Sequence, residues 1–200
     1  TRLEGDQPNY RYQAVFKDCL RHQLETKNPE HQLVLHYKAG LVFEKEQQWD
    51  EAFHHFIKAR KPAEASRIIL VIGEDYVRNG KWSLVLNWLG LLPKATVLAS
   101  AELLLLKAAT LVHLGDSAEA ARILTELLDK KAYGSDTLLQ VKLLNWRCAS
   151  LRMMGQFSEA KRNIKNAIAV LNVNGGPPDV KGDVYRRLGD ICAEQGQFKG

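Results

Sequence analysis

The six histidines are the residues of this chain best suited to metal chemistry, because a neutral imidazole is a common metal ligand. His54 and His55 are adjacent, and adjacent side chains leave a helix in different directions, so these two do not hold one ion together. His31 and His36 are five residues apart, one more than the spacing of four that places two ligands on one helix face. The spacing favours surface or interface histidines over a metal site.

Phosphate-binding and nucleophile motifs are also missing from the sequence. The nearest approach to a phosphate-binding loop runs from Gly73 to Gly80-Lys81, but six residues separate the glycines where the motif has four, and Trp82 replaces the hydroxyl residue that binds magnesium. Gly115-Asp116-Ser117 does not continue into a G-x-S-x-G nucleophile turn. The sequence therefore predicts a chain that is not an enzyme and holds no cofactor or metal of its own.

Composition narrows the class of protein. The chain has 200 residues, of which 46% are apolar and 26% charged, which is typical of a folded globular chain and excludes wholesale disorder. The net charge of +5 is spread thinly, with a modest basic excess over residues 151–200, so it does not by itself indicate nucleic-acid binding. No apolar run approaches the roughly 18 residues that a membrane span needs.

Cysteine usage and the chain ends suggest the setting. Cys19, Cys148 and Cys192 are odd in number and have no C-x-x-C spacing, which argues against a disulfide framework or a zinc site and favours a cytoplasmic protein. The sequence begins at Thr1 and stops in Phe198-Lys199-Gly200 without a natural terminus, so we expect it to be a piece of a longer chain.

A short phrase recurs along the chain at intervals of 33 to 41 residues. It begins at Gln47, Gly80, Gly115, Gly155 and Gly196, and usually continues with an aromatic residue two positions later or with an acidic residue before alanine. Apolar residues at spacings of three and four precede each occurrence and follow several of them, which is typical of amphipathic helices. This period predicts an all-α array of helix–turn–helix repeats over residues 29–200, with the last repeat truncated.

Glycine and proline support this reading. Pro29, Pro62, Pro93 and Pro177-Pro178 all fall between predicted helices. Gly40, Gly73 and Gly189 each lie seven residues before a turn position, inside a predicted helix, as do Ala108 and Cys148 in the other repeats. Small residues at this place predict close approach of the partner helix.

Residues 1–28 fall outside the array. Leu3 to Tyr12 are expected to form a short β-hairpin with its turn at Gly5 to Asn9, and Ala14 to about Thr26 is expected to form an amphipathic helix.

The array resembles the tetratricopeptide repeat family. Gly155, Phe157 and Ala160, and again Leu188-Gly189, Cys192, Gly196 and Phe198, match the family's small, turn and aromatic positions, whereas Val85 stands where alanine is usual. The resemblance implies an α-α solenoid, a superhelix whose concave face is lined by the first helix of each repeat.

A narrower resemblance is to the MalT-like, LuxR-type, ATP-dependent transcriptional activators. The segment Tyr10 to Leu20 is similar to the end of their winged-helix module, although Gln13 replaces a usual histidine. Two elements of their helical arm are similar to Trp49-Asp50-Glu51-Ala52 and to Asn87-Trp88-Leu89-Gly90-Leu91-Leu92-Pro93. The resemblance implies that residues 1–28 are a winged-helix remnant and that ATP binding and DNA binding belong to other domains of the full-length chain.

The tetratricopeptide resemblance also places a ligand groove. Towards the C-terminal end its groove-facing positions are mostly polar and fall on Lys142, Asn145, Arg152, Met153, Arg186 and Asp190. Four of them, Lys142, Asn145, Arg152 and Arg186, could together hold an anionic or hydroxyl-rich ligand by charge-assisted and amide hydrogen bonds. A solvated helix face would carry the same residue types. In the same way Trp49, Trp82, Trp88 and Trp146 suit either ligand stacking or core packing.

Two functions fit these features. The first is the sensor region of a bacterial transcriptional activator, which binds a small-molecule inducer or a protein on its concave face and passes the signal to a nucleotide-dependent switch elsewhere. The second is a general tetratricopeptide scaffold that docks peptides and has no part in transcription. Neither involves a membrane, and both allow self-association.

Overall fold

The computed structural model describes residues 2–3, 9–10 and 29–196. Near the N-terminus β1 (Arg2–Leu3) pairs antiparallel with β2 (Asn9–Tyr10), so that Arg2 faces Tyr10 and Leu3 faces Asn9. Most of the expected turn and the whole expected helix from Ala14 to Thr26 lie outside the described residues. The winged-helix remnant therefore stays a prediction.

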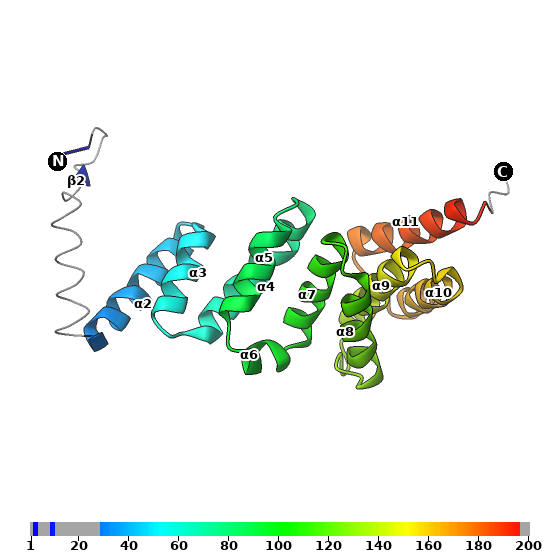
Figure 1. Ribbon diagram of the computed structural model, residues 1–200, viewed down its shortest axis with the longest axis horizontal. Coiled ribbons are helices and arrows are strands. Elements are labelled where there is room, and N and C mark those ends of the chain that lie inside the picture. The colour runs from blue at the N-terminus through cyan, green and yellow to red at the C-terminus, as the bar shows by residue number, and fades with distance from the viewer. Residues whose placement is uncertain (1, 4–8, 11–28, 197–200) are drawn as a thin grey trace. The chain divides into compact units, whose positions relative to one another are not determined.

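The rest of the described chain is all-α, as the sequence predicts, and its ten helices follow one another in chain order (Figure 1). They are α2 (Pro29–Lys45), α3 (Trp49–Lys58), α4 (Pro62–Arg78), α5 (Trp82–Leu91), α6 (Lys94–Leu98), α7 (Ala101–His113), α8 (Ser117–Asp129), α9 (Thr137–Met153), α10 (Phe157–Asn174) and α11 (Pro178–Glu194). Within residues 29–196 no helix is both long and apolar enough to cross a lipid bilayer.

Contacts divide the chain into two compact units, Thr1–Ala65 and Ser66–Gly200, with the division inside α4. The domain boundary expected after residue 28 borders residues outside the described part of the chain and stays a prediction. In the first unit α2 packs on α3. Phe53 and Phe56 of α3 are fully buried, and the ring of Phe56 lies 6.1 Å from that of Tyr37 in α2. The pair of helices thus has a small aromatic core.

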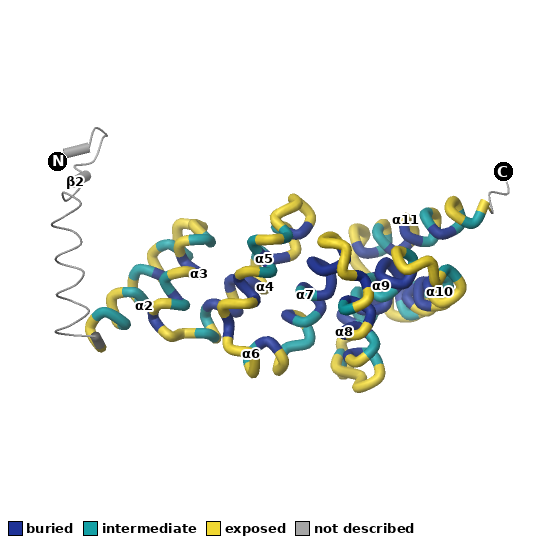
Figure 2. The backbone as a smooth tube through the Cα atoms, viewed as in Figure 1, coloured by how far each residue is buried: buried dark blue, intermediate teal, exposed yellow. Residues whose placement is uncertain are grey.

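In the second unit each helix from α7 to α11 packs against the next, and α5, α7, α9 and α11 also contact one another in that order. Two apolar clusters meet at α9. Leu139 and Leu143 pack with residues of α7 and α8, whereas Val141 and Leu144 pack with residues of α10 and α11. As a result α9 is buried on several sides, and the dark blue segments of Figure 2 gather around α7, α8 and α9.

The recurring phrase marks the turns between paired helices. Its first residue has a positive φ at every occurrence, with 58° at Gln47, 77° at Gly80, 90° at Gly115, 74° at Gly155 and 64° at Gly196. After α9, for example, the amide of Gln156 donates to the carbonyl of Leu151 and the amide of Gly155 to that of Arg152. The same pair of bonds closes α2, α4 and α7, so the left-handed residue ends each helix in a Schellman motif.

Helix starts also follow from local chemistry. Ser100, Asp116 and Asp136 accept hydrogen bonds through their side chains from the third residue of α7, α8 and α9. The predicted proline boundaries are confirmed in the described chain, since Pro29, Pro62 and Pro178 occupy the first helical position, where no amide is needed. The sequence reading missed α6, a helix of five residues.

The small residues inside helices behave in two ways. A Cβ atom at Gly40 would lie 2.8 Å from two ring atoms of Phe56, and one at Gly73 would lie 2.4 Å from Leu106, so close approach is confirmed at both places. At Gly73 the neighbour comes from α7 and not from the following helix. At Gly189 a Cβ atom would meet nothing within 4 Å, but no helix after α11 belongs to the described residues, so the prediction is untested there.

Candidate functional site

The six residues predicted to line a ligand groove lie on α9 and α11, and all four charged ones form ion pairs. The Nζ of Lys142 lies 2.5 Å from Glu74 in α4, Arg152 pairs with Glu194 in α11, and Arg186 pairs within its own helix. The partners of Arg186 are Asp183 at 3.3 Å and Asp190 at 3.6 Å.

The two uncharged members differ in exposure. Met153 is 58% exposed at the end of α9. Asn145 is only 6% exposed, and its Oδ1 accepts no hydrogen bond. The structure therefore spreads the predicted residues along two helices. Of the six, Arg186 pairs with Asp190 and Arg152 contacts its neighbour Met153, whereas the ion pairs of Lys142 and Arg152 are with residues outside the predicted set.

A row of aromatic rings runs across α5, α7 and α9. Trp82, at the start of α5, stacks on His113 with ring centres 4.9 Å apart and ring planes only 2° from parallel. His113, at the end of α7, meets the ring of Trp146 in α9 edge to face at 5.4 Å. We call Trp82, His113 and Trp146 the aromatic row. Burial together with the charge of Arg187 lowers the pKa of His113, so the neutral imidazole is the form favoured in the row.

Arg187 of α11 continues the row. Its guanidinium carbon lies 4.5 Å from the centre of the Trp146 ring, which is a cation–π contact. The residue is 8% exposed, and its Nε has no hydrogen-bond partner. Burial, and then the charge of Arg186, lower the pKa of Arg187 to about 10, which leaves the side chain charged at neutral pH.

Cys148 lies on α9, one turn before Arg152. Its side chain is fully buried, and burial raises the pKa of the thiol to about 11, although the charges of Arg187 and Arg152 oppose that rise. A thiol with such a pKa is almost entirely protonated at neutral pH and is a poor nucleophile. Cys148 is therefore a packing residue in this site.

The arginine that the structure buries is the neighbour of the one the sequence reading selected. Trp146 and Arg187 each lie nine residues before a turn glycine, Gly155 and Gly196, so they occupy equivalent places in successive repeats. That shared offset is a signal that could have found them. It was overlooked because the family's groove positions point to Asn145 and Arg186 instead.

A second side-chain pair was also missed. The Nδ1 atoms of His36 in α2 and His55 in α3 lie 3.0 Å apart, which is hydrogen-bond distance. Burial and the charge of His36 lower the pKa of His55, so one of the two rings stays neutral and accepts from the other. Among the described residues no three histidine, cysteine or carboxylate side chains gather to hold a metal ion.

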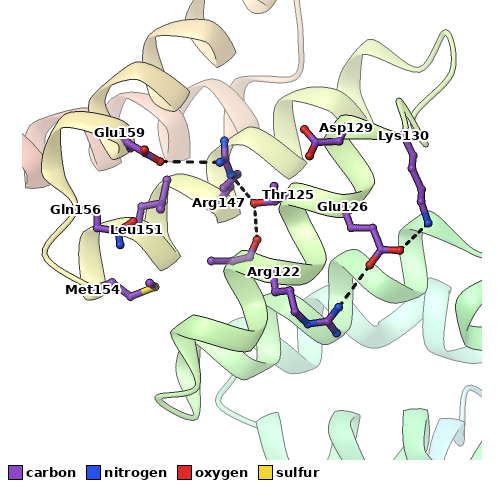
Figure 3. Close-up of a pocket in the computed structure, with 11 residues that line it drawn as sticks. Arg122, Thr125, Glu126, Asp129, Lys130, Arg147, Leu151, Met154, Gln156 and Glu159 are labelled. Atoms are coloured by element: carbon purple, nitrogen blue, oxygen red, sulfur yellow. Dashed lines mark hydrogen bonds and ion pairs between the residues drawn. The ribbon is translucent and has the colours of Figure 1, made fainter.

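A pocket of about 560 Å³ lies between α8, α9 and α10, and none of the six predicted residues lines it (Figure 3). Arg147 enters it from α9, donates to Thr125 at 2.9 Å and to Asn163 at 3.0 Å, and lies 4.0 Å from Glu159. Figure 3 also shows Glu126 between Arg122 and Lys130, with which it forms ion pairs. Five of the six charged residues that line the pocket take part in these ion pairs, and Asp129 stands outside them, so the pocket offers no cluster of like charges to select a ligand.

Comparison with known proteins adds no relative to this picture. No protein family, curated protein or solved structure matches the chain. The candidate site therefore rests on its own geometry, which joins three aromatic rings and a buried arginine across α5, α7, α9 and α11.

Proposed function

We propose that this chain is a binding module built as a tetratricopeptide-like superhelix and that it serves as the arm or sensor region of a MalT-like transcriptional activator. Catalysis, ATP binding and DNA binding would belong to other domains of the full-length protein. The module would bind an inducer or a partner protein on the surface formed by α7, α9 and α11, which we call the α7/α9/α11 face.

Two observations together carry the proposal: the same turn recurs along the chain, and every second helix from α7 to α11 contacts the next. The phrase positions at 47, 80, 115 and 155 close four helices with the same pair of backbone bonds. Beyond the turns, α7 contacts α9 and α9 contacts α11, as first helices do in a stack of helix pairs. Such stacking gives the face a continuous surface drawn from several repeats.

The chemistry of that face suits a binding role better than a catalytic one. It presents aromatic rings and guanidinium groups, which recognise ligands by stacking and charge, and the thiol of Cys148 is buried and protonated. A ligand bound there would influence the rest of a regulator only by binding two arrangements of the whole protein with different affinity. Release of a nucleotide switch for oligomerisation and promoter binding is the outcome expected for a MalT-like activator.

The test uses the full-length product of the gene. The proposal predicts a nucleotide-binding loop and a winged helix in the coding sequence upstream of Thr1, and ATP binding by the purified protein at one nucleotide per chain. An upstream region of another kind, or a full-length protein that binds no ATP, would contradict the regulator and favour a peptide-docking scaffold.

A pair of variants then tests the face. Lys142→Ala with Arg152→Ala removes one lysine and one arginine from α9, and Arg162→Ala with Lys165→Ala removes the same residue types from exposed positions of α10. The first pair should change activation of the regulator's own promoter in cells, and the second should not. Equal behaviour of the two pairs would exclude the α7/α9/α11 face as the sensing surface.

A further inference from the structure

Arg187 is a buried cation without an anion. It is 8% exposed, and within the described part of the chain it makes neither a hydrogen bond nor an ion pair, only the contact with the Trp146 ring. The charge of Asp183 does reach it, but the carboxylate of Asp183 pairs with Arg186 at 3.3 Å. The cation–π contact uses a face of the guanidinium, and the N–H of Nε, which lies in its plane, has no acceptor.

A second guanidinium lies nearby. Arg152 of α9 pairs with Glu194, yet its buried Nε also lacks a partner. Cys148 lies one turn before Arg152 on α9, and the charges of Arg187 and Arg152 both lower the pKa of its thiol, against the larger effect of burial. The charge of Arg152 also lowers the pKa of Arg187. Two positive charges therefore act on each other between α9 and α11, and Glu194 is the only carboxylate in the described chain that forms an ion pair with either.

Folded proteins seldom leave buried charges and donors in this state. A buried unpaired charge is costly, and a buried polar atom without a protein partner calls for an explanation, of which a bound water or ion is one. Guanidinium groups present several donors in a fixed fork, which matches the paired oxygens of a carboxylate or a phosphate. An oxyanion between Arg152 and Arg187 would supply the missing acceptors and relieve the repulsion between the two cations.

We propose that Arg187 and Arg152 bind the oxyanion group, carboxylate or phosphate, of a small ligand, and that Trp146 holds the Arg187 guanidinium in place for it. The proposal rests on the binding role proposed for the α7/α9/α11 face and names the chemistry of its ligand. It also moves the centre of the site from Arg186, which the sequence suggested, to Arg187.

Calorimetric titration of the 200-residue chain with inorganic phosphate and with acetate, at fixed ionic strength, tests the site. Arg187→Met removes the charge and keeps an apolar side chain in the buried place, whereas Arg186→Met makes the same change at the neighbouring exposed residue. We expect at least one anion to bind, its Kd to rise at least about tenfold in Arg187→Met, and to change less than about twofold in Arg186→Met. Whichever anion binds more tightly identifies the group.

Three results would overturn the site: neither anion binds, Arg187→Met binds as well as the parent, or Arg186→Met weakens binding equally. Thermal unfolding of Arg187→Met should occur at the parent temperature or above, because an apolar residue replaces an unpaired buried charge. If that variant fails to fold, Arg187→Lys keeps the charge but loses the fork, and unchanged binding by it would equally overturn the proposal. Failure of anion binding leaves the ATP-binding result for the full-length protein unaffected, so the two proposals can fail separately.

Discussion

The guanidinium of Arg187 in α11 lies over the ring of Trp146 in α9, with its central carbon 4.5 Å from the ring centre. This contact joins two helices that are separated in the chain by the whole of α10. It also extends the aromatic row of Trp82, His113 and Trp146, so that one line of side chains links four helices. The helices that form the α7/α9/α11 face are thus held together by contacts between these side chains.

The contact itself can be measured with a double-mutant cycle. Trp146→Leu should cost more free energy of unfolding in the parent than in the Arg187→Met background, because only the parent loses a cation–π contact. We expect a coupling energy of about 0.5–2 kcal/mol from urea unfolding followed by circular dichroism. Additive effects, within about 0.3 kcal/mol, would show that the two side chains are neighbours without a favourable interaction.

Gln47 gives a test of the repeated turn. It has a φ of 58° at the place where the other repeats have glycine, and a side chain makes that conformation costly. Gln47→Gly should therefore raise the free energy of unfolding by about 1 kcal/mol, while Gly155→Ala should lower it by a similar amount. Chemical denaturation of the three proteins measures both shifts, and a loss of stability in Gln47→Gly would refute the left-handed turn at residue 47.

The glycines inside helices should respond differently to the same substitution. Gly40→Ala forces a methyl group against the fully buried ring of Phe56, and such overpacking typically costs about 1–3 kcal/mol, more than the gain in helix propensity of about 1 kcal/mol. Gly189→Ala meets nothing within 4 Å and should stabilise the chain by up to about 1 kcal/mol. Thermal denaturation of both variants checks the prediction, which an equal gain at the two positions would contradict.

His113 should make stability depend on pH. Its pKa lies below the usual 6.5 in the folded chain, mainly through burial, so the unfolded chain binds a proton at a higher pH than the folded one. The contribution of His113 to the free energy of unfolding is therefore fully present above about pH 6.5, the pKa in the unfolded chain. It is lost as the pH falls from there through the lower pKa of the folded chain.

His113→Phe keeps a ring against Trp82 and removes the titration. Unfolding free energies at about pH 7.5 and about pH 5.5 should differ less in this variant than in the parent. His55, whose pKa is also lowered, keeps part of the dependence in both proteins. An identical loss on acidification in parent and variant would mean that His113 has no share in it.

Local features of the fold could be predicted from the sequence, and contacts between distant residues could not. The turns at Gly80, Gly115 and Gly155 were predictable because a left-handed residue, a helix end and a following aromatic or acidic residue lie within a few positions of one another. The pairing of His36 with His55 spans 19 residues and depends on how α2 and α3 cross. No periodicity in the sequence encodes that contact.

In the candidate site, too, the sequence predicts the helix on which a residue lies but not which of two neighbouring residues faces the next helix. The sequence predicts the polar end of the groove on α9 and α11, where Arg152 pairs with Glu194. It selected Arg186, which pairs with Asp183 and Asp190 on its own helix, over Arg187, which is buried against Trp146. A difference of one residue is a rotation of 100° about the helix axis, and only packing against α9 decides it.

Hydrogen–deuterium exchange of the whole chain, with and without inorganic phosphate or acetate at matched ionic strength, tests the central claim most directly. The claim is that the α7/α9/α11 face binds ligand through Arg187 and Arg152. It predicts slower exchange in peptides that cover residues 137–153 and 178–194 with at least one of the two anions, and no change in residues 117–129. Protection confined to α8 and α10, around the pocket at Arg147, or no protection by either anion, would contradict it.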